Sequence, residues 1–207
     1  MYYFFILLSL MDLRIEQLSE SNFKDYEALT SCQGVGGCYC AFWHQKITSM
    51  AEWEARQKED PLLNRESVLI KVRTGYHVGV LAYSGEDLAA WISVGPLTDF
   101  YWTWKRVAKL GEGSKNIAGI MCFTMAQKFR GKGLQAKILN ELKVYAKEKG
   151  WKVIEAYPFD ANAIEKYKDD VIWPGMAKGY AAAGFERIDS HWLSSEDAGR
   201  SIYRVEV

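Results

Sequence analysis

The sequence predicts an α+β domain, an α/β arrangement of three layers in which a mixed and mostly antiparallel sheet is flanked by helices. Residues 117–150 read as a buried strand, a glycine-rich turn and an amphipathic helix, and the apolar segment 153–157 follows as a strand parallel to the first. Residues 79–94 read as an antiparallel hairpin. Two more strands, near 186–192 and 202–207, are expected after the last helix. The chain that remains is too short for the second half of a doubly wound parallel domain.

Local patterns place the other elements. In chain order we expect a strand at 13–18, a helix at 23–30, a helix from about 50, a helix at 65–73, a short helix within 100–109 and a last helix at 175–183. Ser49 is the expected N-cap of the helix from residue 50, because Glu52 falls in the first turn of that helix. Pro61 is expected to end or interrupt the same helix, since proline has no backbone N–H to donate.

Length and charge indicate one globular domain with no general attraction for polyanions. The 207 residues suffice for a single core, and 49% of them are apolar and 25% charged. Lys and Arg together number 26, as do Asp and Glu, so neither nucleic acid nor an anionic membrane is an expected partner. We assign residues 12–207 to one domain and expect a cytoplasmic protein with reduced thiols. A homodimer is left open.

The first eleven residues form a separate apolar segment. The segment is shorter than the roughly 20 residues that a membrane-spanning helix needs. It also lacks the basic start and the small-residue cleavage site of a signal peptide. We interpret residues 1–11 as a packed N-terminal extension or as a misread start, with Met11 as the true first residue.

Four soft potential metal ligands, Cys32, Cys38, Cys40 and His44, lie within one short span. Their spacing does not match the usual patterns of structural zinc sites, so no metal is expected. The loop that carries them is rich in glycine and aromatic residues. The loop either lines an acceptor cleft or is a connector with buried aromatic side chains, and the sequence does not separate these interpretations.

The turn Arg130-Gly131-Lys132-Gly133 predicts an anion site at the start of a helix. Glycine allows a tight turn and a close approach of the ligand, and the free N–H groups of a helix N-terminus attract phosphate. A Walker loop is excluded, because Gly133 follows Lys132 where Ser or Thr is required. A dinucleotide fingerprint fits Gly131, Gly133 and Ala136, but residues 127–130 separate its first glycine from the strand.

The same segment resembles motif A of the GNAT superfamily of N-acyltransferases. That motif is a hydrophobic strand followed by Arg or Gln, two residues, Gly, one residue and Gly or Ala. Arg130 and Gly133 match it, whereas Gln135 departs from it at a position where the family has a small residue. Downstream, Gly179–Phe185 resembles the Tyr-x-x-x-Gly-Phe signature of the family's last helix. Two signatures in the right order are more specific than either alone.

The resemblance implies the GNAT acyl-CoA N-acyltransferase fold, with acetyl-CoA as cosubstrate and an amine of a small molecule or protein as acceptor. Cys38–Trp43 together with Val153–Pro158 is similar to a poorly characterised bacterial subgroup of that superfamily. In GNAT enzymes the pantetheine arm lies between two splayed strands and the pyrophosphate lies on the glycine turn. The matching positions for cofactor binding are Phe123, Thr124, Met125, Arg130, Gly131, Lys132, Gly133, Leu134, Gln135 and Ala136.

Two residues are candidates for proton transfer, and a backbone N–H near Met125 is the expected oxyanion donor. Tyr180 matches the family's general acid; a core tyrosine is the alternative. Glu155 is the candidate base, acting directly or through water, and is equally compatible with a structural role. Residues 117–125 contain no carboxylate, so proton loss to bulk water stays open.

Other functions also stay open. Gln135 and the absence of a carboxylate from residues 117–125 are compatible with a catalytically silent, GNAT-like sensor of CoA. The partial dinucleotide fingerprint keeps an oxidoreductase as a less favoured alternative. Turnover with amines would separate an enzyme from a sensor.

Overall fold

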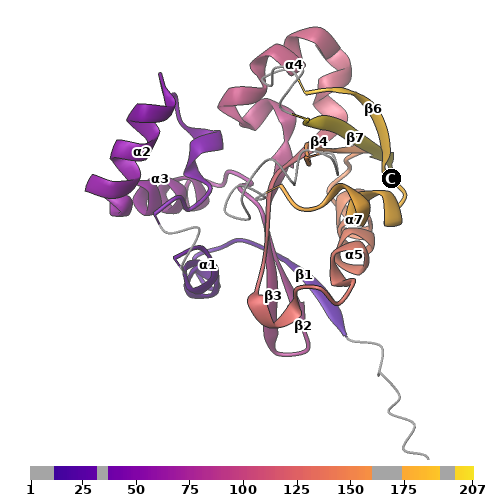
Figure 1. Cartoon of the computed structure of the whole chain (residues 1–207), viewed down its shortest axis with the longest axis horizontal. Coiled ribbons are helices and arrows are strands. Elements are labelled where there is room, and N and C mark those ends of the chain that lie inside the picture. The colour runs from indigo at the N-terminus through magenta and orange to yellow at the C-terminus, as the bar shows by residue number, and fades with distance from the viewer. Residues whose placement is uncertain (1–11, 32–36, 160–173, 192–198) are drawn as a thin grey trace, which may run out of the picture.

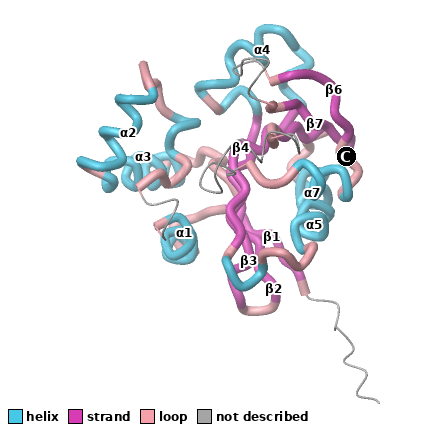
Figure 2. The backbone as a smooth tube through the Cα atoms, viewed as in Figure 1, coloured by secondary structure: helices cyan, strands magenta, loops and turns pink. Residues whose placement is uncertain are grey.

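The computed structural model describes residues 12–31, 37–159, 174–191 and 199–207. Its centre is a seven-stranded sheet in the order β1-β2-β3-β4-β5-β7-β6, with helices on both faces (Figures 1 and 2). Neighbouring strands are antiparallel except for β4 and β5, which are parallel. The predicted mixed, mostly antiparallel sheet flanked by helices is therefore confirmed.

The strands and helices lie close to the predicted ranges. The strands are β1 (Leu13–Gln17), β2 (Val80–Ser84), β3 (Asp87–Pro96), β4 (Ile117–Met125), β5 (Val153–Ala156), β6 (Glu186–Ser190) and β7 (Ser201–Glu206). The helices are α1 (Phe23–Thr30), α2 (Met50–Glu59), α3 (Pro61–Arg73), α4 (Trp104–Leu110), α5 (Leu134–Glu148) and α7 (Ala177–Ala182). Short 3-10 segments are η1 (Ala41–His44), η2 (Leu97–Asp99), η3 (Tyr101–Thr103), η4 (Gly111–Asn116) and η5 (Gln127–Phe129). Among the described helices, none has the length and apolar content needed to span a bilayer.

Alternation along the strands divides the apolar side chains between two cores. Val80 and Ala82 of β2 join the core beneath α5, whereas Leu81 and Tyr83 join the core beneath α1. Helix α5 buries the predicted stripe of Leu134, Ile138, Leu139, Leu142, Tyr145 and Ala146. Figure 1 shows α5 and α7 together on one side of the sheet, with α1 on the other side and α2 and α3 farther out.

The start of α2 is as predicted, and α2 ends just before Pro61, as expected. The Ser49 hydroxyl accepts a hydrogen bond from the Glu52 N–H at 3.1 Å, and the Glu52 carboxylate accepts one from the Thr48 N–H at 2.8 Å. Pro61 also begins the next helix, α3, most of which was predicted as the helix at 65–73, and Asp60 separates the two helices with φ of −149°. Proline is tolerated at the first helical position, where its missing N–H would be unpaired in any case.

Two predictions fall on residues that the structure leaves undescribed. The interpretations of residues 1–11 as an extension or a misread start lie outside the described residues, and so does the position of Cys32. The assignment of 12–207 to one domain stays a prediction.

Candidate functional site

Strand β4 changes its surroundings halfway along its length. Its first half, Ile117 to Ile120, pairs with β5 from Val153 to Ala156. From Met121 onward the register with β3 continues, but β5 has ended and no described strand replaces it. The second half of β4 therefore keeps an open edge on the side that β5 leaves.

A β-bulge between β3 and β4 lies at the point where β4 loses its pairing with β5. Ser93 of β3 faces Cys122, whereas the next residue, Val94, faces Ile120, so Met121 is the extra residue. Met121 and Cys122 consequently both face the core beneath α1, while the flanking Ile120 and Phe123 face the core beneath α5. The sequence carried no signal for this bulge, because consecutive apolar residues are normal in a strand buried on both faces.

The backbone of the open edge presents hydrogen-bonding groups away from β3. The Ala126 N–H donates to the Ala89 carbonyl at 2.9 Å, so Ala126 faces β3. Backbone groups alternate in direction along a strand, so those of Met125 and Phe123 face the open edge. The Met125 carbonyl agrees with this direction, because it accepts a hydrogen bond from Arg130 Nε at 2.9 Å instead of from β3.

The open edge is followed, after the short segment η5, by the glycine turn and the start of α5. Gly131 and Gly133 have φ of 73° and 70°, in the left-handed region, and a Cβ at either position would meet no atom within 4 Å. Helix α5 has no side-chain N-cap, and the amides of Gly131, Lys132 and Gly133 donate no hydrogen bond to another described residue. Exposed donors at a helix N-terminus, with the charge of Lys132 beside them, form a suitable anion site.

Gln135 departs from motif A without obstructing this turn, because its side chain is directed toward α7. Its amide nitrogen donates to the Met176 carbonyl at 3.3 Å, and its amide oxygen accepts from the Met176 N–H at 3.4 Å. A Cβ on Gly179 would lie 2.4 Å from Gln135 Cδ, and a Cβ on Gly175 would lie 2.8 Å from Gln135 Nε2. Two glycines thus make room for the larger side chain. In the sequence, the signal for this arrangement was Gly179, a glycine inside the predicted helix at 175–183.

Tyr180 lies at the inner side of this region and is fully buried. Its hydroxyl donates to the Pro174 carbonyl at 2.6 Å, and its ring packs edge-on against Phe185 with centroids 5.3 Å apart. Burial raises the pKa of Tyr180 well above its ordinary value, so the hydroxyl keeps its proton at neutral pH. A Cβ on Gly175 would contact both Tyr180 and Phe123 at 3.4 Å, so the tyrosine lies near the β4 edge.

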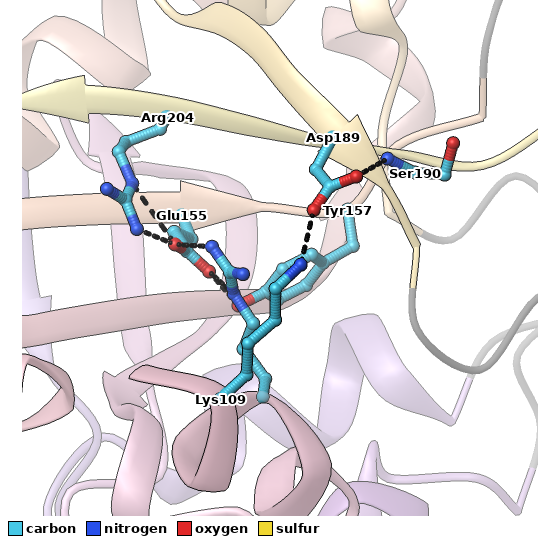
Figure 3. A network of polar contacts seen from close by, with 7 residues as sticks. Lys109, Glu155, Tyr157, Asp189, Ser190 and Arg204 are labelled. Atoms are coloured by element: carbon cyan, nitrogen blue, oxygen red, sulfur yellow. Dashed lines mark hydrogen bonds and ion pairs between the residues drawn. The ribbon is translucent and has the colours of Figure 1, made fainter. Parts of the chain in front are cut away.

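Glu155 lies instead in a closed polar cluster on the paired half of the strands (Figure 3). Its carboxylate is fully buried and accepts from Arg106 at 3.1 and 2.7 Å, from both nitrogens of the Arg204 fork, and from the Tyr157 hydroxyl at 3.1 Å. Burial acts to raise the pKa of Glu155, but the hydrogen bonds and charges of the two arginines prevail and lower the pKa. A carboxylate held in this way is a weak base, and its surroundings favour the structural alternative.

The cysteine loop packs into the core beneath α1. Cys40 is buried, and its sulfur accepts a hydrogen bond from Trp91 Nε1 at 3.2 Å. Tyr39 and Cys40 have φ of 47° and 48°, a conformation that residues other than glycine rarely adopt. Within the described residues no group of three His, Cys, Asp or Glu side chains is arranged to hold a metal ion.

A comparison with models of known protein families identifies the family in which this fold and site occur. The model of the Acetyltransferase (GNAT) family matches residues 35–168. The chain belongs to the GNAT acetyltransferase family. The GNAT chain is therefore an acetyl-CoA-dependent acetyltransferase, and the family match selects acyl transfer over dinucleotide binding. A comparison with curated proteins gave no match.

Solved structures of GNAT proteins share the fold of this GNAT chain at low sequence identity. Aminoglycoside acetyltransferase AAC(6')-Ib, in complex with ribostamycin and coenzyme A, is 15% identical with a TM-score of 0.58, over 93% of this chain and 91% of that chain. The aminoglycoside N(6')acetyltransferase of Legionella pneumophila is 15% identical with a TM-score of 0.54, over 94% and 91%. The paia N-acetyltransferase of Thermoplasma acidophilum, with coenzyme A, is 13% identical with a TM-score of 0.50, over 95% and 100%.

Proposed function

We propose that this GNAT chain transfers the acetyl group of acetyl-CoA to a primary amine of a small molecule by direct attack. The observation that carries the proposal is the open edge of β4, followed after η5 by amides at the N-terminus of α5 that have no partner among the described residues. Acetyl-CoA combines an amide-bearing arm with a pyrophosphate, and these are the groups that a free strand edge and a helix N-terminus bind.

The pyrophosphate and the pantetheine arm of acetyl-CoA each have a matching surface in this proposal. The pyrophosphate lies on the amides from Gly131 to Ala136, with Lys132 adding positive charge. The pantetheine arm lies along Phe123, Thr124 and Met125 and forms strand-like hydrogen bonds with the groups that β5 leaves free. Leu134 and Gln135 support the turn from the α5 and α7 side. Arg130 holds the end of β4 through the Met125 carbonyl.

The reaction begins with loss of a proton from the acceptor ammonium, whose pKa in water is about 10.4 for an alkylamine of the lysine type. The free amine attacks the thioester carbonyl, the C–N bond forms, and the oxyanion is stabilised by a β4 amide at Phe123 or Met125. One such donor contributes about 3 kcal/mol. Collapse of the intermediate breaks the C–S bond, the nitrogen gives its second proton to water to leave a neutral amide, and CoA departs as a thiolate, which takes a proton.

Tyr180 supplies that proton. Its raised pKa keeps the hydroxyl protonated at neutral pH, so it is present as a donor to the sulfur while the C–S bond breaks, and water restores the proton that it gives up. In the described state the hydroxyl donates to Pro174, so donation to the thiolate requires exchange of one hydrogen bond for another. Glu155 has no part in this scheme, and the proton of the ammonium passes to water.

The choice of a small-molecule acceptor is supported by relatives of the same fold. The solved complexes of AAC(6')-Ib contain ribostamycin in one case and kanamycin in another, together with coenzyme A. Both are acceptors with several amino groups. We therefore place polyamino compounds first among the acceptor classes to be tested.

A panel of amines with acetyl-CoA, read by release of free thiol, tests the proposal. Aminoglycosides, alkyl polyamines, amino acids and lysine peptides form the panel, and calorimetry measures acetyl-CoA binding in parallel. Thiol release with at least one small amine is the expected result. Tight binding of acetyl-CoA with no release across the whole panel would favour the CoA sensor.

A further inference from the structure

A cavity of about 770 Å³ is lined by residues outside the open edge of β4. The end of α3 and the turn after it form one wall, η1 contributes His44, and the segment from η2 to α4 forms the rest. The cavity is lined by His44, Lys71, Tyr76, Thr98, Asp99, Phe100, Tyr101, Thr103, Trp104, Val107 and Ala108. None of these residues belongs to β4, β5 or the glycine turn. Occupancy of this cavity is therefore a separate matter from acetyl-CoA binding.

The rim of the cavity is aromatic and exposed to solvent. Tyr76, Tyr101 and Trp104 are 49%, 41% and 56% exposed, whereas Phe100 is buried at 2%. Large aromatic side chains are usually buried when they serve only packing, so three exposed ones around a single hollow indicate a surface for a flat apolar group. The volume lies within the roughly 300–1,000 Å³ that is common for small-molecule sites.

Two opposite charges line the same cavity and do not neutralise each other. Lys71 and Asp99 form no ion pair with each other, and neither forms one with another described residue. The contacts shown are weak, since Asp99 accepts from the Thr98 hydroxyl at 3.3 Å and Lys71 Nζ lies 4.4 Å from the centroid of the Tyr76 ring. Partly buried charges are costly without a partner, so each is available to a ligand of opposite charge.

The His44 imidazole leaves this charge pattern unchanged. The His44 ring packs against Phe100 with centroids 4.9 Å apart. Burial, with a smaller effect of the Lys71 charge, lowers the pKa of His44 to about 3, so the ring is neutral at physiological pH. Burial raises the pKa of Asp99, and the Lys71 charge opposes this rise, which places both charges within electrostatic reach of one another.

We infer that this cavity binds a zwitterionic α-amino acid with an aromatic side chain. The ammonium of the ligand pairs with the Asp99 carboxylate, the carboxylate of the ligand pairs with Lys71 Nζ, and the ring packs against Trp104 and Tyr101. Only a ligand that carries both charges and a flat apolar group satisfies all three features together. No residue assigned to the acetyl-CoA site lines the cavity, so the amino acid binds outside that site.

Calorimetric titration of the full chain with four probes tests the assignment. L-Tryptophan is the complete ligand, tryptamine lacks its carboxylate, indole-3-propionate lacks its ammonium, and L-alanine lacks its ring. We expect tryptophan to bind and each incomplete probe to bind about tenfold or more weakly, because each loses a charge-assisted hydrogen bond or the aromatic contact. No binding of tryptophan at millimolar concentration, or equal binding of tryptamine, would overturn the assignment.

Two variants test which charge of the cavity pairs with which charged group of the ligand. Lys71→Met should abolish the preference for tryptophan over tryptamine, and Asp99→Asn should abolish the preference for tryptophan over indole-3-propionate. Lys24→Met and Glu86→Gln, exposed positions away from the cavity, are matched controls and should retain both preferences. Circular dichroism melting verifies that each variant is folded. Preferences that persist in both folded cavity variants would contradict the proposed pairing.

Discussion

The polar groups beside the two halves of β4 differ in whether they already have hydrogen-bond partners. Where β4 pairs with β5, the Glu155 carboxylate is enclosed by Arg106, Arg204 and the Tyr157 hydroxyl. Where β5 has ended, β4 has no strand partner on that side among the described residues, and the amides of the glycine turn donate to none of them. A polar cluster that satisfies itself stabilises the fold, whereas polar groups left open are available to a ligand.

The distance between the two regions is short. Gly119 pairs with Glu155, and Phe123 at the open edge follows four residues later, a separation of about 13 Å along a strand. Both regions looked like catalytic candidates in the sequence. Their contrast predicts that changes in the closed cluster affect stability, and that changes at the open edge affect ligand binding or turnover.

The largest expected effect is the loss of unfolding free energy in Glu155→Gln, within the closed cluster. The substitution leaves the buried Arg106 guanidinium without its counter-charge, and breaking a buried pair costs about 3–5 kcal/mol. Urea denaturation measures the loss of unfolding free energy. Asp189→Asn is the matched control, because its pair with Lys109 is exposed and is worth at most about 1 kcal/mol. A stable Glu155→Gln variant with reduced turnover would instead support a catalytic role.

The same carboxylate predicts a pH dependence of stability. The pKa of Glu155 is lower in the folded state than its ordinary value, so its stabilisation is present above the unfolded pKa and is lost as pH falls through the folded pKa. Denaturation curves of the wild type and Glu155→Gln should therefore differ at neutral pH and converge on acidification. A constant difference across the acidic range would contradict this account.

Tyr180→Phe should slow turnover by about 100-fold or more while leaving acetyl-CoA affinity nearly unchanged, because general acid catalysis typically contributes that much. Steady-state thiol release and calorimetry separate the two quantities. Phe185→Leu, a change in the ring that packs on Tyr180, is the control for altered packing. Unchanged turnover in Tyr180→Phe would show that this tyrosine contributes only to core packing.

Gly133→Glu should remove the rise in melting temperature that acetyl-CoA produces, since a carboxylate would occupy the anion site. At 100 times the dissociation constant a ligand stabilises by about 2.7 kcal/mol, which sets the size of the lost effect. Gly150→Glu is the matched control, because Gly150 has a similar φ of 77° at the opposite end of α5. A normal acetyl-CoA shift in folded Gly133→Glu would show that the turn does not bind the cofactor.

Gln135→Ala is expected to have the smallest effect, a loss of about 1 kcal/mol of unfolding free energy with acetyl-CoA affinity retained. The variant removes the two long hydrogen bonds to Met176 and leaves space beside Gly179. Thermal melting and calorimetry measure the two quantities, and Lys137→Ala on the exposed side of α5 is the control. A large loss of acetyl-CoA affinity would place Gln135 in the cofactor site itself.

The local sequence was sufficient to predict the helices, the strands and the glycine turn before α5. The buried stripe of α5, the Ser49 cap and the left-handed glycines Gly131 and Gly133 depend on residues a few positions apart, and short-range sterics and hydrogen bonding decide them. Two family signatures added the order of the strands around this unit. These signals led from the sequence to the GNAT fold and to the segment that carries the open edge.

Tertiary structure alone decided which polar residues are enclosed and which are open. Nothing near Glu155 in the chain reveals that Arg106 and Arg204, 49 positions away on either side, arrive at its carboxylate. The bulge at Met121 and the glycines that accommodate Gln135 likewise depend on partners distant in sequence. The sequence by itself determined where a phosphate can meet a helix N-terminus, because that geometry is local. Whether a buried charge is neutralised depends on the partners that folding brings to it.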